Sequence, residues 1–364
     1  MRPGRAVPIA CLAVLALAFL PILLFAFGCG QACSPGHRPT ITLMSYNVHN
    51  LFDARDSGQE YPEFSVRTGR WNEAKYKARL EALAQVVRAA CESTKGPDIL
   101  CLVEVENQAI LEEARKGVLA SSAYIASALV PAPGQAVNCG ILSRFPIREL
   151  KAHGLKAGAR GGRYILEASL ETGSGTLVVF VNHWKSRIEG PEATEGERRE
   201  AAALLADRMA AIIAADPGAE VLACGDFNEG PDDYERMGRA WPTAFMPVAE
   251  AGKAVDNNNC IYIAGSPGEA GLLPWGRPVL YSPWEGSDAW SYVNKGERER
   301  LDGFLIGPGL LDGKGLAFTG FHTLGADFLL DSKGFPLAYS PTRGSGYSDH
   351  LPLILELAIL ADGP

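Results

Sequence analysis

The sequence predicts a mixed α/β fold in which two packed β-sheets carry helices on their outer faces. Three observations predict it. Strongly apolar runs of strand length recur along the chain, helical patterns alternate with them, and a tight turn joins one pair of runs. Such apolar runs are typical of buried strands. The alternation favours parallel strands and the tight turn favours an antiparallel pair, so the sheets are expected to be mixed.

The first half of the expected domain contains two strands and two helices. A strand is expected at 41–48, and a helix within 71–95 because Leu80, Leu83, Ala84, Val87 and Cys91 recur at spacings of three and four. Gly96-Pro97 ends that helix. A strand at 98–105 and a short helix around Ile110 and Ala114 follow.

The second half contains a hairpin, a long helix and further strands. The turn Gly173-Ser174-Gly175 joins two runs into a hairpin. Asp216-Pro217-Gly218 ends a helix at 197–215. Residues 230–290, with many Pro and Gly and with Trp241, Trp275 and Trp284, are interpreted as long loops. Strands are expected at 139–142, 164–170, 176–181, 220–224, 300–306 and 351–357.

The N-terminal segment is interpreted as an export signal. Arg2 and Arg5 precede an uncharged apolar run from Ala6 to Gly28, and Cys29 follows. This arrangement resembles a bacterial lipoprotein signal in which Cys29 receives the lipid. An uncleaved membrane anchor and a freely secreted protein are the alternatives. We expect a signal at 1–28, a linker at 29–39 and one domain at 40–360, forming a monomer that its lipid anchors to the membrane of a bacterial envelope.

Charge and cysteine spacing narrow the functional classes. The 364 residues carry a formal net charge of −8, which argues against the broad basic surface of a high-affinity nucleic-acid binder. A local basic strip for processing nucleic acid remains compatible with this charge. Eight cysteines are present without a Cys-x-x-Cys pair, which argues against a structural zinc site.

Six apolar runs end in side chains that bind metals or handle protons. Such side chains at the ends of neighbouring strands can converge on one rim of a sheet. Asn, Asp and Glu supply oxygen ligands and a base, and His supplies a proton donor or a phosphate contact, so the set suits metal-assisted hydrolysis of a phosphate ester. The runs end at Ser45-Tyr46-Asn47, Leu102-Val103-Glu104, Val181-Asn182-His183, Gly225-Asp226-Phe227-Asn228, Leu301-Asp302 and Ser348-Asp349-His350.

Taken in order, these motifs resemble the endonuclease/exonuclease/phosphatase superfamily, the group of deoxyribonuclease I and exonuclease III. The resemblance extends from about Thr40 to Leu357 and also includes Asn50-Leu51-Phe52-Asp53, Glu106-Asn107 and Trp184-Lys185-Ser186-Arg187. It implies a four-layer α/β sandwich, two mixed sheets flanked by helices. Gly303 departs from the pattern, since many relatives carry a polar residue after the aspartate.

The resemblance also implies roles for the site residues. Glu104, assisted by Asn47 and Asp349, would bind Mg²⁺ or Mn²⁺, which prefer hard oxygen donors. Asp226 would orient or deprotonate the attacking water, and Asn228 would hold that water or a phosphate oxygen. His183 and His350 would stabilise negative charge on the phosphate. Asp302 would pair with His350 and fix its tautomer.

The substrate is the least determined part of the prediction. Arg163 is expected to contact phosphate, with Asn182 as a further candidate. Lys185 and Arg187 would extend a basic strip from His183. Nucleic acid is therefore the favoured substrate. A phospholipid or sphingomyelin phosphodiesterase that exposes Trp275 or Trp284, and a non-catalytic surface-binding protein, remain as alternatives.

Overall fold

The computed structural model describes residues 39–155, 163–253 and 259–360. The predicted signal, Cys29 and nearly all of the predicted linker lie outside the described residues. Among the helices of the described ranges, none has the length and apolar character needed to cross a membrane.

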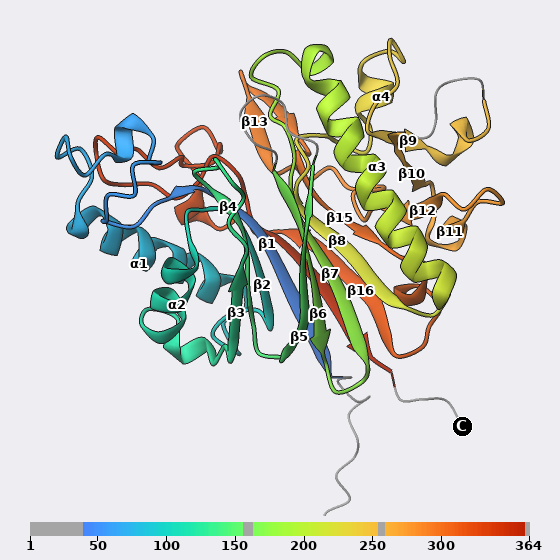
Figure 1. Ribbon diagram of the computed structural model, residues 1–364, viewed down its shortest axis with the longest axis horizontal. Coiled ribbons are helices and arrows are strands. Elements are labelled where there is room, and N and C mark those ends of the chain that lie inside the picture. The colour runs from blue at the N-terminus through green and yellow to red at the C-terminus, as the bar shows by residue number, and fades with distance from the viewer. Residues whose placement is uncertain (1–38, 156–162, 254–258, 361–364) are drawn as a thin grey trace, which may run out of the picture. The chain divides into compact units, whose positions relative to one another are not determined.

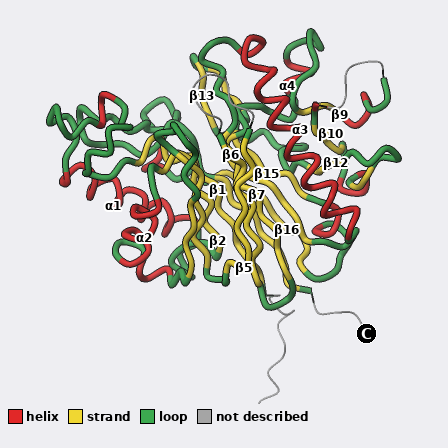
Figure 2. The backbone as a smooth tube through the Cα atoms, in the orientation of Figure 1, coloured by secondary structure: helices red, strands yellow, loops and turns green. Residues whose placement is uncertain are grey.

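Two β-sheets form the centre of the domain, and each mixes parallel and antiparallel pairs (Figures 1 and 2). The first sheet has the order β16-β17-β1-β2-β4-β3. Its strands are β1 (Thr40–Leu51), β2 (Ile99–Val105), β3 (Ala126–Leu129), β4 (Asn138–Ser143), β16 (Leu316–Thr323) and β17 (Leu353–Ile359).

The second sheet has the order β5-β6-β7-β8-β15-β12-β10-β9, with β11 paired to β12. A separate two-stranded ribbon consists of β13 (Tyr292–Asn294) and β14 (Glu297–Glu299). The strands of the second sheet are β5 (Ile147–Gly154), β6 (Tyr164–Glu171), β7 (Thr176–His183), β8 (Glu220–Asp226), β9 (Phe245–Pro247), β10 (Ile261–Ala264), β11 (Gly271–Leu272), β12 (Pro278–Tyr281) and β15 (Asp302–Ile306).

Helices cover the outer faces of both sheets. The helices α1 (Glu73–Ala90) and α2 (Gln108–Lys116) pack on the first sheet, and α3 (Pro191–Ala215) packs on the second (Figure 1). Asn72 and Asn107 cap α1 and α2 by accepting backbone N–H groups, as residues at this position commonly do. A short α4 (Asp233–Arg236) follows β8. Single 3₁₀ turns occur at Pro62–Phe64, Ala120–Ser122, Val248–Glu250, Pro267–Glu269, Pro308–Leu310 and Asp327–Leu329.

A continuous apolar layer lies between the two sheets. It includes Leu43, Val103, Val181, Cys224 and Leu355, all buried. The alternate side chains of β1 and β2 pack beneath α1 and α2, and those of β7 and β8 pack beneath α3. The order helix, sheet, sheet, helix confirms the predicted four-layer α/β sandwich.

The sheet register brings the polar strand ends to one rim. The strands β1 and β2 are parallel, as are β7 and β8. His183 lies opposite Asp226 in the β7–β8 pair, and Asp302 lies opposite Asp226 in the β15–β8 pair. Three of the predicted site residues are therefore neighbours in one sheet because of backbone pairing alone.

The structure corrects the loop interpretation of 230–290. Four short strands in this segment, β9 to β12, extend the second sheet. Trp284 is buried and donates a hydrogen bond from its ring nitrogen to the carbonyl of Asp302 at 2.9 Å, so it is a core residue. Trp275 is 54% exposed, in the turn between β11 and β12.

Candidate active site

Local backbone geometry aims the polar side chains out of the rim. Both β1 and β2 lose regular register where Asn47 and Glu104 occur. Glu104 and Asn228 adopt left-handed φ values of 69° and 50°. Such geometry costs roughly 1 kcal/mol per non-glycine residue and is often found at functional sites. Gly225 permits the close approach of β7, since a Cβ there would lie 2.1 Å from the carbonyl oxygen of Asn182.

Two carboxylates face each other across the two sheets. The side-chain amide of Asn47 donates to Glu104 Oε1 at 3.1 Å and to Asp226 Oδ2 at 3.0 Å. Its own oxygen accepts the backbone N–H of His49 at 2.9 Å, and Glu104 Oε2 accepts the backbone N–H of Asn50 at 2.9 Å. Within the described ranges, neither carboxylate pairs with Lys or Arg.

His183 completes the first of two groups of potential metal ligands. Its Nε2 lies 3.6 Å from Glu104 Oε1 and 3.8 Å from Asp226 Oδ2. One ligand atom from each of these three residues lies within 4.8 Å of the others. Burial, with smaller contributions from Arg163 and His350, holds the pKa of His183 well below its usual value. His183 is therefore a neutral imidazole.

The pKa of His350 is shifted in the opposite direction. Its Nδ1 lies 2.7 Å from Asp302 Oδ2, and both side chains are buried. Burial acts to lower the pKa of His350, but the Asp302 carboxylate, with smaller contributions from Asp226 and Asp349, raises the pKa well above its usual value. His350 is therefore an imidazolium whose Nε2 lies 4.0 Å from Asp226 Oδ2. The ring of Tyr292, from the β13–β14 ribbon, lies 4.7 Å from the His350 ring, centre to centre.

Asp226 stands between the two histidines. Burial raises its pKa from 3.8 to about 7, although His350 opposes the shift. Its Oδ1 accepts the backbone N–H of Asn228 at 2.9 Å. The side-chain amide of Asn228 donates to the carbonyl of Trp184 at 3.2 Å, which orients the amide oxygen. Asp226 thus has the near-neutral pKa that suits a general base at neutral pH.

Asp349 lies at the more exposed side of the site. Its Oδ1 is 3.5 Å from His49 Nδ1, and its side chain is 35% exposed. The preceding Ser348 donates to the carbonyl of Asn47 at 2.7 Å, which ties this loop to β1. Direct metal ligation by Asn47 or Asp349 stays a prediction. Arg79 of α1 donates to the carbonyls of Val48 and His49 and has a structural role.

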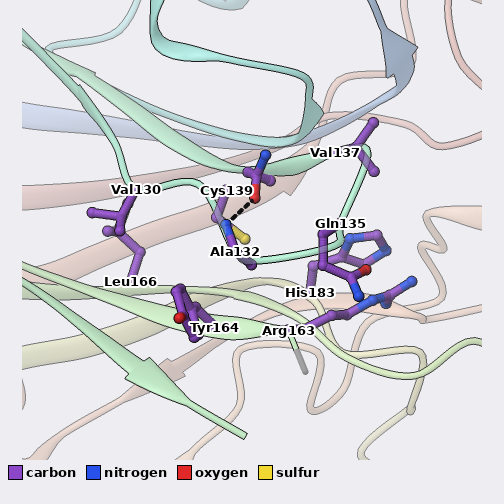
Figure 3. A pocket seen from close by; sticks show the side chains of 10 residues that line it. Val130, Ala132, Gln135, Val137, Cys139, Arg163, Tyr164, Leu166 and His183 are labelled. Atoms are coloured by element: carbon purple, nitrogen blue, oxygen red, sulfur yellow. Dashed lines mark hydrogen bonds between the residues drawn. The ribbon is translucent and has the colours of Figure 1, made fainter. Parts of the chain in front are cut away.

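Arg163 borders a narrow hollow beside His183. Figure 3 shows the side chains of Gln135, Arg163 and His183 gathered at one end of this hollow, with Val130 and Leu166 at the other. The guanidinium of Arg163 also donates to the carbonyl of Trp184. Arg163 therefore lies beside His183, and its contact with phosphate stays a prediction.

The predicted basic strip is not formed. The strand β7 ends at His183, so Lys185 and Arg187 lie in a loop and do not share a strand face. Lys185 Nζ lies 2.9 Å from Glu189 Oε1 at the surface. Arg187 turns inward, where its Nε donates to the carbonyl of Asn228 at 2.6 Å and its other nitrogens face Asp233, Glu229 and Glu299. Arg187 supports the catalytic loop from behind.

Asn182 is also removed from any substrate. It is fully buried and donates to the carbonyls of Phe180 and Cys224, both at 3.2 Å. Its oxygen accepts the ring N–H of Trp184 at 3.0 Å. Alternation along β7 explains this placement, because Asn182 and His183 point to opposite faces of the second sheet.

Sequence reasoning missed the support beneath the Asp226 loop. Arg198 of α3 is fully buried and contacts Glu229 Oε2 at 2.7 Å and Glu195 Oε2 at 2.6 Å. It was unremarkable in the sequence because one arginine in a charged helical segment normally faces solvent. The ribbon carrying Tyr292 was also missed, although Asn294-Lys295-Gly296 is a recognisable hairpin-turn signal.

Comparison with known proteins adds independent support. The model of the endonuclease/exonuclease/phosphatase family matches residues 42–239. A family protein from Bacteroides thetaiotaomicron is 17% identical, with a TM-score of 0.51 over 89% of this chain and 99% of that chain. Truncated TDP2 from Caenorhabditis elegans is 17% identical, with a TM-score of 0.50 over 88% of this chain and 97% of that chain. No curated protein matches the sequence.

At these identities the two structures show a shared fold, whereas the family match covers more than half of the chain and includes the β1, β2, β7 and β8 rim. The order of the rim residues, their convergence and the family match agree. The chain belongs to the endonuclease/exonuclease/phosphatase family.

Proposed function

We propose that the protein is a divalent-metal-dependent phosphoesterase that hydrolyses phosphodiester bonds of nucleic acid. The observation that carries the proposal is the convergence of Glu104, Asp226, His183 and the Asp302–His350 pair on one rim. These groups come from five different strands and loops. A packing role for the fold does not require them to meet.

The donor set fits Mg²⁺ or Mn²⁺. Glu104 and Asp226 are carboxylates that share one neutral amide donor, Asn47, and have no Lys or Arg partner among the described residues. Hard oxygen donors in this charge state suit these ions. Glu104 would hold the ion, assisted by Asn47 and Asp349, and the bound ion would offset charge on the phosphate.

The residues of the chain then divide the chemistry. Asp226 accepts a proton from the water that attacks phosphorus in line, opposite the leaving oxygen. Asn228 orients that water or a phosphate oxygen. The charged His350 and the neutral His183 donate hydrogen bonds to phosphate oxygens, and Asp302 keeps the His350 ring oriented and protonated. Donors placed in advance stabilise the transition state without reorganisation.

Nucleic acid is favoured over lipid on the placement of the tryptophans. A lipid phosphodiesterase would expose aromatic side chains near the site. Trp284 is buried. Asp302 begins β15 at the catalytic rim, and Ile306 ends β15 at the far end. The last residue of β12, Tyr281, lies opposite Ile306. The turn that holds Trp275 precedes β12 and is therefore farther still from the rim. Trp275 therefore leaves the sheet away from the catalytic rim.

One panel of substrates tests the proposal. Purified protein with Mg²⁺ is incubated with plasmid DNA, single-stranded oligonucleotides, sphingomyelin and bis(p-nitrophenyl) phosphate. We expect hydrolysis of DNA and of the chromogenic diester, and its loss in Asp226→Ala and His350→Ala. Cleavage of sphingomyelin alone would assign the lipid alternative. A folded protein that hydrolyses none of them would indicate a binding protein.

We also propose that the chain is exported and anchored as a monomer through a lipid on Cys29. The support is the sequence pattern of residues 2–29. In a bacterial host, Cys29→Ala should move the protein from the membrane to the soluble envelope fraction and abolish labelling by radioactive palmitate. Labelling that persists in the variant contradicts this assignment.

A further inference from the structure

A groove of about 470 Å³ lies next to the catalytic rim. The loop after β7, the start of α3, α4 and the turn of the β13–β14 ribbon form its walls. Its lining includes Arg187, Ile188, Pro191, Arg236, Met237 and Lys295. The volume falls within the range of ligand sites in proteins, roughly 300–1,000 Å³.

Two contacts join the groove to the catalytic residues. Arg187, which lines the groove, donates to the carbonyl of Asn228 at 2.6 Å. Tyr292, in the ribbon that forms the opposite wall, pairs with His350 through the backbone, and its ring is tilted by 38° to the His350 ring. The groove is therefore adjacent to the elements that position Asn228 and His350.

The charges of the groove favour an anionic occupant. The acids that line it, Asp233 and Glu299, already face Arg187, and Asp233 also accepts from Arg236 at 2.9 Å. Lys295 is exposed and forms no ion pair with any acid of the described residues. The lining therefore holds three cations against two acids, and Lys295 is the cation that has no acidic partner among the described residues.

The ribbon presents Lys295 on a rigid turn. Asn294 lies opposite Glu297, so Lys295 and Gly296 form a two-residue hairpin loop. Both have positive φ, 50° and 92°, which corresponds to the tight turn whose twist matches the strands. The apolar side chains of Ile188, 92% exposed, and Met237 lie on the facing wall, where they can contact the faces of bases.

We propose that this groove binds the single polynucleotide strand that continues from the scissile phosphate, with a backbone phosphate contacting Lys295. This inference rests on the proposed function and adds to it a preference for polymers over small diesters. Charge complementarity and the connection to Asn228 and His350 support the strand as occupant. The groove exceeds the needs of a single phosphate group.

The test replaces Lys295 and a matched lysine elsewhere. Lys295→Asn removes the charge and suits the turn, because Asn tolerates positive φ. Lys295→Glu reverses the charge. Lys314→Asn is the control, since Lys314 is also exposed and also precedes a glycine in a turn. That glycine, Gly315, lies beside Glu220, at the opposite end of β8 from Asp226.

The readout is the ratio of kcat/KM for a ten-nucleotide single strand to kcat/KM for bis(p-nitrophenyl) phosphate. Loss of one phosphate contact changes the slope of log affinity against log salt concentration by about 0.7. Between 0.1 M and 1 M salt, this change corresponds to about fivefold in affinity. We expect Lys295→Asn to lower the ratio by about fivefold at 0.1 M salt, Lys295→Glu to lower it further, and Lys314→Asn to leave it unchanged.

Three results overturn the groove assignment while leaving phosphoesterase activity intact. In the first, the kcat/KM ratio is unchanged in Lys295→Asn and Lys295→Glu. In the second, Lys314→Asn lowers the ratio as much as Lys295→Asn does. In the third, the Lys295 variants lose activity equally on both substrates, because the ribbon acts only through His350. By contrast, wild-type protein that hydrolyses the chromogenic diester but no oligonucleotide refutes the nuclease proposal itself.

Discussion

The Asp302–His350 pair offers the sharpest test of the proposed chemistry. Asp302→Asn keeps the shape of the side chain, and its amide oxygen can still accept from His350 Nδ1, which lies 2.7 Å from Asp302 Oδ2. The backbone of Asp302 remains paired with Asp226 in the β15–β8 ladder. The substitution therefore removes a charge from a buried pair with little change in geometry.

The magnitude follows from the burial of this pair. Burial already acts to lower the pKa of His350, and the Asp302 carboxylate is the strongest group that opposes it. Without the carboxylate, His350 loses its proton at neutral pH and donates more weakly to a developing negative charge. Loss of one such donor typically costs about 10²–10³ in kcat. This corresponds to about 3–4 kcal/mol in activation free energy.

The assay is the pH dependence of kcat with bis(p-nitrophenyl) phosphate, alongside thermal unfolding in EDTA. The pKa of His350 is higher in the folded protein than in the unfolded chain, where it is about 6.5. The resulting stabilisation is complete at pH values below the unfolded-state pKa and is lost as pH rises through the folded-state pKa. The difference in Tm between wild type and Asp302→Asn should therefore be largest in acid and shrink as pH rises.

A second histidine–carboxylate pair supplies the control. His153 Nε2 lies 2.6 Å from Glu167 Oε2, and Glu167 is buried in β6 of the second sheet. Glu167→Gln should lower Tm and leave kcat unchanged. Equal losses of kcat in the two variants, or an unchanged kcat in Asp302→Asn, would refute the reasoning that the Asp302 charge acts through His350.

Four further outcomes follow from the geometry. Glu104→Gln should weaken Mg²⁺ binding by at least about tenfold in calorimetry while the far-ultraviolet circular dichroism is retained. Arg187→Gln should lower kcat for bis(p-nitrophenyl) phosphate by about tenfold or more through misplacement of Asn228. In EDTA, Tm should fall as pH rises towards 7, because burial raises the pKa of Asp226 from 3.8 to about 7, and Asp226→Asn should flatten this fall. Leu205→Ala, at a fully buried position of α3, should cost about 2–5 kcal/mol in unfolding free energy and leave kcat unchanged.

The rim could be predicted from sequence because its strands are buried on both faces. Apolar runs such as Val221–Cys224 place the following polar residue at the strand end, whatever the rest of the fold does. The sheet partners then follow from the family order. Asp226, His183 and Asp302 therefore meet as expected.

The direction of individual side chains was harder to predict. The two-residue alternation of β7, if continued past His183, would place Lys185 and Arg187 on the same face. The strand ends at His183, so the alternation does not continue. Arg187 finds buried acids from α4 and β14, elements more than forty residues away in sequence. No local pattern contains that information, because tertiary partners decide whether a charged side chain is solvated or buried.

Residues 230–290 show the same limit for strands. The strands β9 to β12 have two to four residues each, too few for alternation to stand out from the surrounding Pro and Gly. Their stability comes from pairing with the edge of a preformed sheet beyond β15. Short strands of this kind depend on context more than on intrinsic propensity.

The charges around Asp226 indicate why a divalent cation would suit this rim. Glu104 and Asp226 share a single neutral donor in Asn47, so burial favours the protonated form of Asp226. A bound divalent cation favours the ionised form of both carboxylates, since opposite charge lowers the pKa of a nearby acid. His350 substitutes for it only in part, because Asp302 matches its charge and the pKa of Asp226 stays raised to about 7. The pairing of His350 with Asp302 therefore leaves Glu104 and Asp226 without a matching Lys or Arg among the described residues, and a divalent cation would balance their charge.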